Sequence, residues 1–390
     1  MRSRQWGSVG WKPTGGRRLL VLGAGAGQLG LLAAARERGL FVTAVDRDPG
    51  APGFRYADRR AIVSLDDEPA LERLAEAGRV DGVIAPGSDW PVGAAARIAA
   101  RFGLPHPISP AVAVLSSSRL RQRERLAEAG IPQTRWKLVT GPDDELGFPC
   151  VVKAPDRQAP RGLSLVRSPK ELGPAVTAAL RASRNGLCLV EELAEGPEAR
   201  VTAFSLGGVF HPLTVTDGLP DAFVWPSGRP GPAIAMAERA AEALGIEEGP
   251  TSTRLLVEPG GRVLVTGLAA RLGGAHDAEL CRAARGIDLN GLALSAALGE
   301  EIEPARLEQG PRAGGACVRF LPMPRREPAE AKGIAQAERV EGVERIWVYR
   351  GSDRGGAVLT TGTSGLEARD RAARAAECIR FRPVDAEAVA

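Results

Sequence analysis

The sequence contains few residues of the kinds that bind transition metals or form disulfides. It has three histidines and five cysteines, and the cysteines are far apart along the chain. Zinc sites combine such residues at short, characteristic spacings, and disulfide scaffolds pair cysteines within small domains. Neither pattern is present, so we do not expect a histidine-based zinc site, and we expect a reduced, cytoplasmic setting.

Long apolar runs and an excess of one charge are also missing. No run approaches the ~20 apolar residues that a membrane-spanning helix needs. The 51 basic and 47 acidic residues leave a net charge of +4, and arginine and glutamate are interleaved throughout. We therefore expect neither a nucleic-acid partner nor a membrane partner. Residues 1–16 are basic but lack the apolar segment of a signal peptide, which predicts a disordered tail.

The chain is instead rich in glycine and proline, with 48 and 30 residues, and 44% of it is hydrophobic. Its 390 residues are enough for two or three domain cores. In residues 17–112, short apolar runs alternate with segments of helical spacing, which predicts a doubly wound parallel α/β domain. The expected strands are residues 19–22, 41–45, 61–63, 82–85 and 105–108.

The first strand-to-helix turn of this domain carries the sequence GAGQLG at residues 25–30, and Asp46 ends the next strand. This spacing matches the dinucleotide fingerprint, in which glycines admit a pyrophosphate and the acid binds the ribose hydroxyls. The same glycines also suit a tight structural turn or a contact with a substrate carboxylate. A nicotinamide-dependent enzyme that uses Gly25 to Gly30 is therefore a distant alternative.

A lysine at a strand end is the next candidate site residue. Residues 116–130 predict a charged helix whose arginines mostly face solvent, and the strands after it end at Lys153, followed by the loop APDRQAPRG at 154–162. A fixed ammonium beside exposed backbone N–H groups suits a polyphosphate. As the alternative, a strand-ending lysine is commonly a snorkelling surface residue.

Two further segments combine strands with charged residues. Residues 189–201, LVEELAEGPEARV, contain a buried strand, an acidic pair, a Gly-Pro turn, a third acid and a second strand. Residues 253–274 predict two strands joined by a Pro-Gly-Gly turn, the second ending at Arg271 and a glycine pair.

In this order, the segments resemble ATP-grasp enzymes over about residues 18–382. The resemblance implies a pre-ATP-grasp domain at 17–112, an ATP-grasp module at 113–302 made of two α+β subdomains (131–187 and 188–302), and a small C-terminal α+β cap at 313–390. It implies that ATP or ADP binds between the subdomains. The residues that it implies for the nucleotide are Arg119, Lys153, Arg161, Gly162, Glu191, Glu192, Leu193, Ala194, Glu198 and Arg254, with Glu191 at the adenine and Glu198 at the ribose.

The resemblance also implies a magnesium site that this chain does not complete. The two family glutamates and the asparagine fall at Arg254, Gly267 and Ala269, and only Arg271 of that run is retained. Asp277 and Glu279 are the nearest acids that could replace them. An arginine at position 254 points instead to an anion site, with Arg119, Arg161 and Lys153 nearby.

Family members activate a carboxylate as an acylphosphate with the γ-phosphate of ATP, and an amine then displaces the phosphate. For this chain the resemblance implies small-molecule carboxylate and amine substrates, with Lys153 and Arg271 as catalytic residues. The alternative is a non-catalytic homologue that acts as a nucleotide-binding or regulatory subunit, either as a homodimer or beside an active paralogous subunit. Both interpretations are consistent with the sequence.

Overall fold

The computed structural model describes residues 16–141, 146–156, 162–323, 329–349 and 354–383. Arg161 and nearly all of the predicted tail lie outside these residues. Within them, no helix has both the length and the apolar character to cross a bilayer. The fold is a mixed α/β arrangement with one parallel and three antiparallel sheets, as the sequence predicts.

The N-terminal domain is a parallel sheet of order β3-β2-β1-β4 with helices on both faces. Successive side chains of β1 point to opposite faces, so Leu20 packs towards α2 and α3, and Leu19 packs towards α1 and α9. The predicted doubly wound domain is confirmed. Its elements are β1 (Arg18–Leu22), η1 (Ala26–Gln28), α1 (Leu29–Glu37), β2 (Phe41–Asp46), η2 (Pro52–Tyr56), β3 (Arg59–Ile62), α2 (Glu68–Gly78), β4 (Gly82–Ile84), α3 (Trp90–Phe102) and α4 (Pro110–Ser117).

The strand predicted at 105–108 is wrong, because this segment is a loop. Pro105 and Pro107 have no backbone N–H to donate to a neighbouring strand. The helix predicted at 116–130 is also interrupted. The chain is extended at Ser118, whose side chain accepts a hydrogen bond from the backbone N of Arg121 and so begins a new helix, α5 (Arg119–Glu128).

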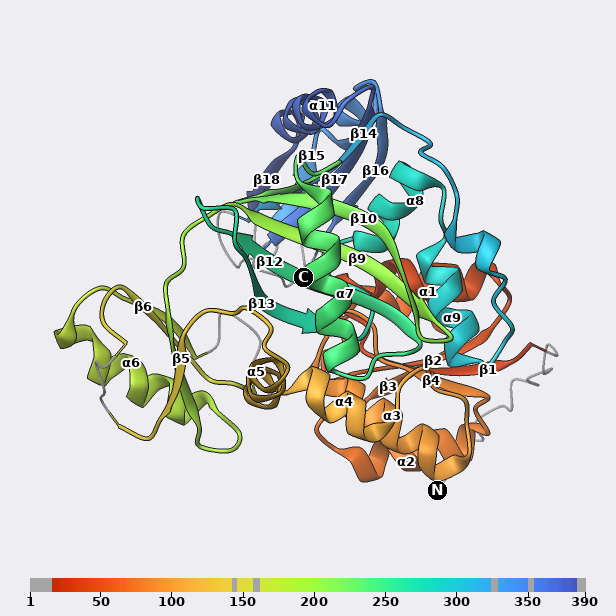
Figure 1. Ribbon diagram of the computed structural model, residues 1–390. Coiled ribbons are helices and arrows are strands. Elements are labelled where there is room, and N and C mark those ends of the chain that lie inside the picture. The colour runs from red at the N-terminus through yellow and green to blue at the C-terminus, as the bar shows by residue number, and fades with distance from the viewer. Residues whose placement is uncertain (1–15, 142–145, 157–161, 324–328, 350–353, 384–390) are drawn as a thin grey trace.

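The small sheet is antiparallel and has the order β5-β8-β6-β7. In Figure 1 it stands with α6 to one side of the molecule. Strand β8 pairs with both β5 and β6, so the subdomain boundary expected at residue 187 falls instead after Glu192. Its elements are β5 (Trp136–Val139), β6 (Cys150–Lys153), β7 (Leu163–Val166), α6 (Pro169–Ala182) and β8 (Cys188–Glu192).

The large sheet has eight strands in the order β13-β12-β9-β10-β11-β14-β17-β16. One face is covered by α7 (Pro230–Ala243), whose Ala233, Ala237 and Ala240 are buried at helical spacing. The hairpin predicted at 253–274 is confirmed. The strands are β9 (Glu198–Leu206), β10 (Val209–Leu219), β11 (Ala222–Trp225), β12 (Gly249–Val257) and β13 (Val263–Ala269), and the helices that follow are α8 (Asp277–Arg285), α9 (Leu289–Ala297) and η3 (Pro304–Leu307).

The C-terminal segment is an α+β unit that pairs its own strands β15 and β18 in a small sheet and has a buried cluster of its own. Its strand β14 pairs with β11, so it extends the large sheet, and α11 packs on the added strands (Figure 1). Its elements are β14 (Gly315–Pro322), β15 (Ala329–Lys332), α10 (Ile334–Ala337), β16 (Val343–Val348), β17 (Arg354–Gly362), α11 (Gly365–Cys378) and β18 (Arg380–Pro383).

Candidate functional site

Three charged side chains meet where the small sheet faces α5. Lys153, at the end of β6, lies with its Nζ 2.6 Å from Oε2 of Glu191 on β8. Arg123 of α5 donates from Nε and Nη2 to the two carboxylate oxygens of Glu191, each at 3.2 Å. All three are buried, with exposed fractions of 9% for Lys153, 5% for Glu191 and 3% for Arg123. We call these three residues the buried triad.

The buried triad contains two cations and one carboxylate. Burial lowers the pKa of Lys153 to about 8, although the carboxylate of Glu191 opposes this effect. Burial alone would raise the pKa of Glu191, but the charges of Arg123 and Lys153 outweigh it and lower that pKa. The buried triad therefore keeps one positive charge without a partner near neutral pH, which favours a bound anion.

Sequence reasoning missed Arg123, which was expected to lie on a solvated helix face. Arginines at 119, 121, 123 and 125 give α5 a uniformly basic appearance. The signal that distinguishes them is spacing, because Arg119 and Arg123 are four residues apart and share one helix face. Next to Arg123, Gln122 exchanges two hydrogen bonds with the backbone of Leu268, at 2.7 Å and 2.9 Å, and so fixes β13 against α5.

The residues after Glu191 lie at the end of β8, where the chain leaves the small sheet. The carboxylate of Glu192 accepts hydrogen bonds from the backbone N and the Nε of Arg135, at 2.8 Å and 2.6 Å. The backbone N of Leu193 donates to the carbonyl of Pro149 at 3.3 Å, and its side chain is exposed. Ala194 follows, half-buried. This strand end keeps an apolar side chain open to solvent, as a platform for a flat ring would.

Glu198 is the first residue of β9, and Gly162 directly precedes β7. The carboxylate of Glu198, at the start of β9, is exposed and lies 3.7 Å from Nη2 of Arg200. Gly162 adopts a φ of +65° and accepts a hydrogen bond at its carbonyl from the backbone N of Ala154 at 2.8 Å. This hydrogen bond joins the two ends of the segment between Ala154 and Gly162. The positive φ at position 162 favours glycine, which has no Cβ.

A cavity of about 350 Å³ lies between the N-terminal domain, the start of α5, the β12-β13 hairpin and β17. Small residues such as Gly87, Gly267 and Gly274 form part of its wall. We call it the arginine cavity, because its charged lining comprises five arginines and one acid. These residues are Asp89, Arg119, Arg200, Arg254, Arg271 and Arg354.

Some of these arginines have partners in the protein. The Nε of Arg271 donates to Oδ1 of Asp89 at 2.8 Å, and its Nη1 donates to the carbonyl of Leu272 at 2.7 Å. Arg200 donates to Asp277 at 3.1 Å. The guanidinium groups of Arg119 and Arg254, by contrast, make no hydrogen bond or ion pair with another described residue. The arginine cavity thus has two cationic groups available for a ligand.

Arg254 lies over the backbone of the opposite strand. It pairs with Gly267 in the antiparallel register, and a Cβ added at Gly267 would lie 3.0 Å from Nη2 of Arg254. The glycine makes room for the guanidinium. Arg254 reaches solvent, and the surrounding protein atoms, followed by the like charges of Arg119 and Arg200, lower its pKa. The arginine cavity therefore carries positive charge that the protein does not neutralise.

The residues at the family's metal positions do not fit magnesium. Magnesium takes oxygen ligands, chiefly carboxylates and water. Arg254 is a cation, and neither Gly267 nor Ala269 has a side-chain oxygen. Throughout the described ranges, no three His, Cys, Asp or Glu side chains come together in a way that could hold a metal ion.

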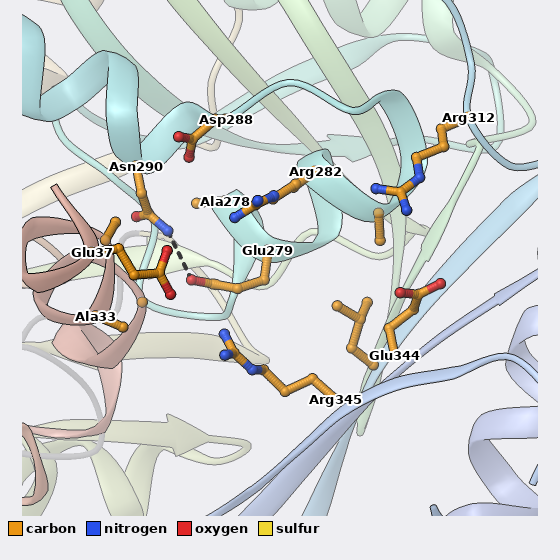
Figure 2. Close-up of a pocket in the computed structure, with 14 residues that line it drawn as sticks. Ala33, Glu37, Ala278, Glu279, Arg282, Asp288, Asn290, Arg312, Glu344 and Arg345 are labelled. Atoms are coloured by element: carbon orange, nitrogen blue, oxygen red, sulfur yellow. Dashed lines mark hydrogen bonds between the residues drawn. The ribbon is translucent and has the colours of Figure 1, made fainter.

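The two replacement acids suggested by the sequence are not brought together. Asp277 is buried beside Arg200 and accepts a hydrogen bond from Oγ of Ser252 at 3.3 Å. Glu279 lines a second cavity, of about 340 Å³, and accepts a hydrogen bond from Nδ2 of Asn290 at 2.9 Å (Figure 2). One acid is thus engaged by an arginine, and the other faces a different cavity.

The glycine turn of the N-terminal domain is filled by protein. A Cβ added at Gly30 would lie 1.5 Å from Oε1 of Glu279, and one at Gly27 would lie 3.5 Å from the Cα of Gly274. Asp46 accepts a hydrogen bond from the backbone N of Ala24 at 3.0 Å. The glycines let α1 approach α8 and the cavity wall, which supports the structural turn.

Comparisons with known proteins show which proteins the chain resembles in sequence and in fold. No protein-family model matches the chain. The formate-dependent phosphoribosylglycinamide formyltransferase from Burkholderia thailandensis is 32% identical over 184 residues, which cover 45% of this chain and 45% of that protein. The same enzyme from Burkholderia pseudomallei matches to the same extent. The chain therefore spans less than half the length of the curated relatives it matches.

Solved structures match nearly the whole chain. The L-amino acid ligase from Bacillus licheniformis has a TM-score of 0.80 at 20% identity, covering 95% of this chain and 99% of that one. The N5-carboxyaminoimidazole ribonucleotide synthetase from Thermotoga maritima has a TM-score of 0.75 at 20% identity, covering 94% and 100%. The biotin carboxylase from Campylobacter jejuni has a TM-score of 0.73 at 17% identity, covering 94% and 92%. The chain therefore has the fold of these enzymes, which is the ATP-grasp fold.

Proposed function

We propose that this chain binds an adenine nucleotide, ATP or ADP, between its small sheet and its large sheet. The observation that carries the proposal is the buried triad, whose uncompensated charge lies at the strand end where a phosphate chain would run. Arg119 is close enough to lower the pKa of Lys153 further. Proteins of this fold include an N5-carboxyaminoimidazole synthetase from Staphylococcus aureus that was solved with ADP.

The nucleotide would lie along residues that the two sheets bring to one opening. The adenine would stack at the end of β8 near Leu193, with Ala194 offering backbone groups to the ring. The exposed carboxylate of Glu198 would accept hydrogen bonds from the ribose hydroxyls. The phosphates would meet Lys153 and Arg119.

We propose binding as the function, with reaction chemistry as a second candidate. A nucleotide-binding or regulatory subunit needs no metal ligands, which agrees with the side chains at positions 254, 267 and 269. It would act on a second copy or on an active paralogous subunit. Ligase chemistry on a small-molecule carboxylate and an amine is favoured by Arg271, which is directed into the arginine cavity as a group that could hold a carboxylate or an acylphosphate.

Lys153→Met is expected to weaken nucleotide binding by about 10-fold to 100-fold, because one charge-assisted hydrogen bond to phosphate is lost. The Glu191–Arg123 pair remains, so the interior stays neutral. Calorimetry with ADP measures the effect. Lys170→Met, at an exposed position on α6, is the matched control and should bind as the unmodified chain does. Unchanged affinity in Lys153→Met would contradict the proposed phosphate position.

Nucleotide affinity is expected to fall at alkaline pH. The pKa of Lys153 is about 8 without ligand, and a bound phosphate raises it because it favours the charged form. Nucleotide binding is therefore strongest below pH 8. The affinity falls as the pH rises from 8 towards the pKa of Lys153 in the complex, by roughly tenfold between pH 7.5 and 9.5. Calorimetry across this range tests it. In Lys153→Arg, whose side chain stays protonated, the decline should disappear.

A further inference from the structure

The charges of the arginine cavity do not balance. Five guanidinium groups and one carboxylate line it. Asp277, just outside the lining, offsets the charge of Arg200, and Asp89 offsets that of Arg271. The guanidinium of Arg354 lies over the ring of Phe320, and the charges of Arg119 and Arg254 remain in a partly enclosed space. Like charges in such a space repel one another more strongly than in water, so an anion that enters is stabilised by both.

The neighbours of Arg254 fix the position of its positive charge in the arginine cavity. Gly267 faces it across the hairpin and leaves the space that its Nη2 occupies. On the other side, Gln122 and Arg123 hold β13 against α5. The guanidinium therefore rests on a fixed hairpin at the positions where the resemblance places two glutamates and their metal.

A guanidinium can perform the charge neutralisation that magnesium gives to a triphosphate. It stays protonated at neutral pH even when its pKa is lowered, and it forms paired hydrogen bonds to phosphate oxygens. Arginines perform this task in phosphoryl-transfer sites, where they stabilise charge on the terminal phosphate.

We propose that the arginine cavity holds the terminal phosphates of the nucleotide through Arg254 and Arg119, without magnesium. The proposal rests on the proposed function, because one nucleotide would reach from the buried triad into the arginine cavity. It adds the chemical form of the ligand, which is the metal-free polyphosphate anion. Magnesium is then a competitor, since it binds the phosphate oxygens that the arginines would contact.

Asp89 acts as the internal counter-ion of this site. Burial alone would raise its pKa, but the charges of Arg271, Arg254 and Arg119 outweigh burial and lower it. One carboxylate thus acts on Arg254 and Arg119, which a phosphate would use, as well as on its ion-pair partner Arg271. An entering phosphate must share them with Asp89, so removing this charge strengthens phosphate binding.

The test is calorimetry of the full chain with ATP, and with inorganic tripolyphosphate as a probe of the phosphates alone, in EDTA and in excess Mg²⁺. We expect both to bind in EDTA, and ATP to bind at least as tightly there as with Mg²⁺. A requirement for Mg²⁺ would overturn the proposal while leaving nucleotide binding intact. If ATP binds under neither condition, the proposed function itself fails.

Two variants with opposite expected effects separate a binding role from a structural one. Arg254→Met should weaken tripolyphosphate binding about 10-fold to 100-fold in EDTA, and Asp89→Asn should strengthen it by about threefold or more. Arg262→Met, at an exposed position beside the hairpin turn, is the matched control and should change nothing. Thermal melting confirms that each variant is folded. Unchanged binding in Arg254→Met, or weaker binding in Asp89→Asn, would contradict the proposal.

Discussion

Replacing Glu191 with glutamine is expected to destabilise the chain by about 3–5 kcal/mol, the cost of leaving buried charges without their partner. Glu191 is the one carboxylate between Lys153 and Arg123 in the buried triad, and all three side chains are at most 9% exposed. The neutral amide has the same shape, so the loss reports charge alone. Denaturant unfolding at pH 7 measures it.

The pH dependence of this variant provides an independent check. Without Glu191, the pKa of Lys153 falls further below that of the unfolded chain, because an attractive charge is removed. A lysine with a lowered pKa in the folded state costs stability in full below that pKa. The cost shrinks as the pH rises above the folded-state pKa and is gone above the pKa of the unfolded chain. The deficit of Glu191→Gln should therefore shrink towards pH 10.

Glu192→Gln is the control for this prediction. Glu192 is the next residue in the chain, but it pairs with the exposed Arg135, and pairs of this kind contribute about 1 kcal/mol or less. A loss in Glu191→Gln no larger than that in Glu192→Gln would contradict the account of the buried triad.

The second large effect is a reversal of the response to magnesium. The triple variant Arg254→Glu, Gly267→Glu and Ala269→Asn restores the acids and the amide that the resemblance implies for a magnesium site. The Cβ added at Gly267 has room once Arg254 is gone, since Nη2 of that residue is its nearest neighbour. In EDTA, two carboxylates would repel the phosphates, and we expect affinity for ATP to fall by more than ~100-fold.

Excess Mg²⁺ should recover most of that affinity in the triple variant, because the new oxygens can hold the metal against the phosphates. In the unmodified chain, the same Mg²⁺ should leave affinity unchanged or lower. Arg254→Met is the control, since it removes the cation without supplying ligands and should not gain from Mg²⁺. Calorimetry of the three proteins with ATP measures this. A triple variant that binds ATP in EDTA like the unmodified chain would contradict the assignment of Arg254.

Local patterns predicted much of the fold. The β12-β13 hairpin follows from two apolar runs around a Pro-Gly-Gly turn, and the N-terminal domain follows from alternating strands and helices. These features depend on neighbouring residues, which a sequence displays directly. Two errors are local, the strand expected at 105–108 and the unbroken helix expected at 116–130. What the sequence does not display is pairing across long distances. Strand β8 joins the small sheet and β14 joins the large one because of partners far away in the chain.

In the candidate site, too, the sequence shows individual residues but not the contacts between distant ones. Lys153 and Glu191 stand out in the sequence as a strand-ending lysine and the first of an acidic pair, but their mutual contact depends on β6 pairing with β8. Arg123 was missed because a basic helix gives no sign of which arginine turns inwards. The role of Asp89 was invisible, because its partner Arg271 lies 182 residues away in the chain.

The most direct test of the central claim is a crystal structure of the chain with ATP and Mn²⁺, in which anomalous scattering locates the metal. The account predicts phosphate oxygens within about 2.7–2.9 Å of guanidinium nitrogens of Arg254, with no manganese peak at the hairpin. A manganese ion bridging the phosphates to protein carboxylates, with Arg254 turned away, would contradict it.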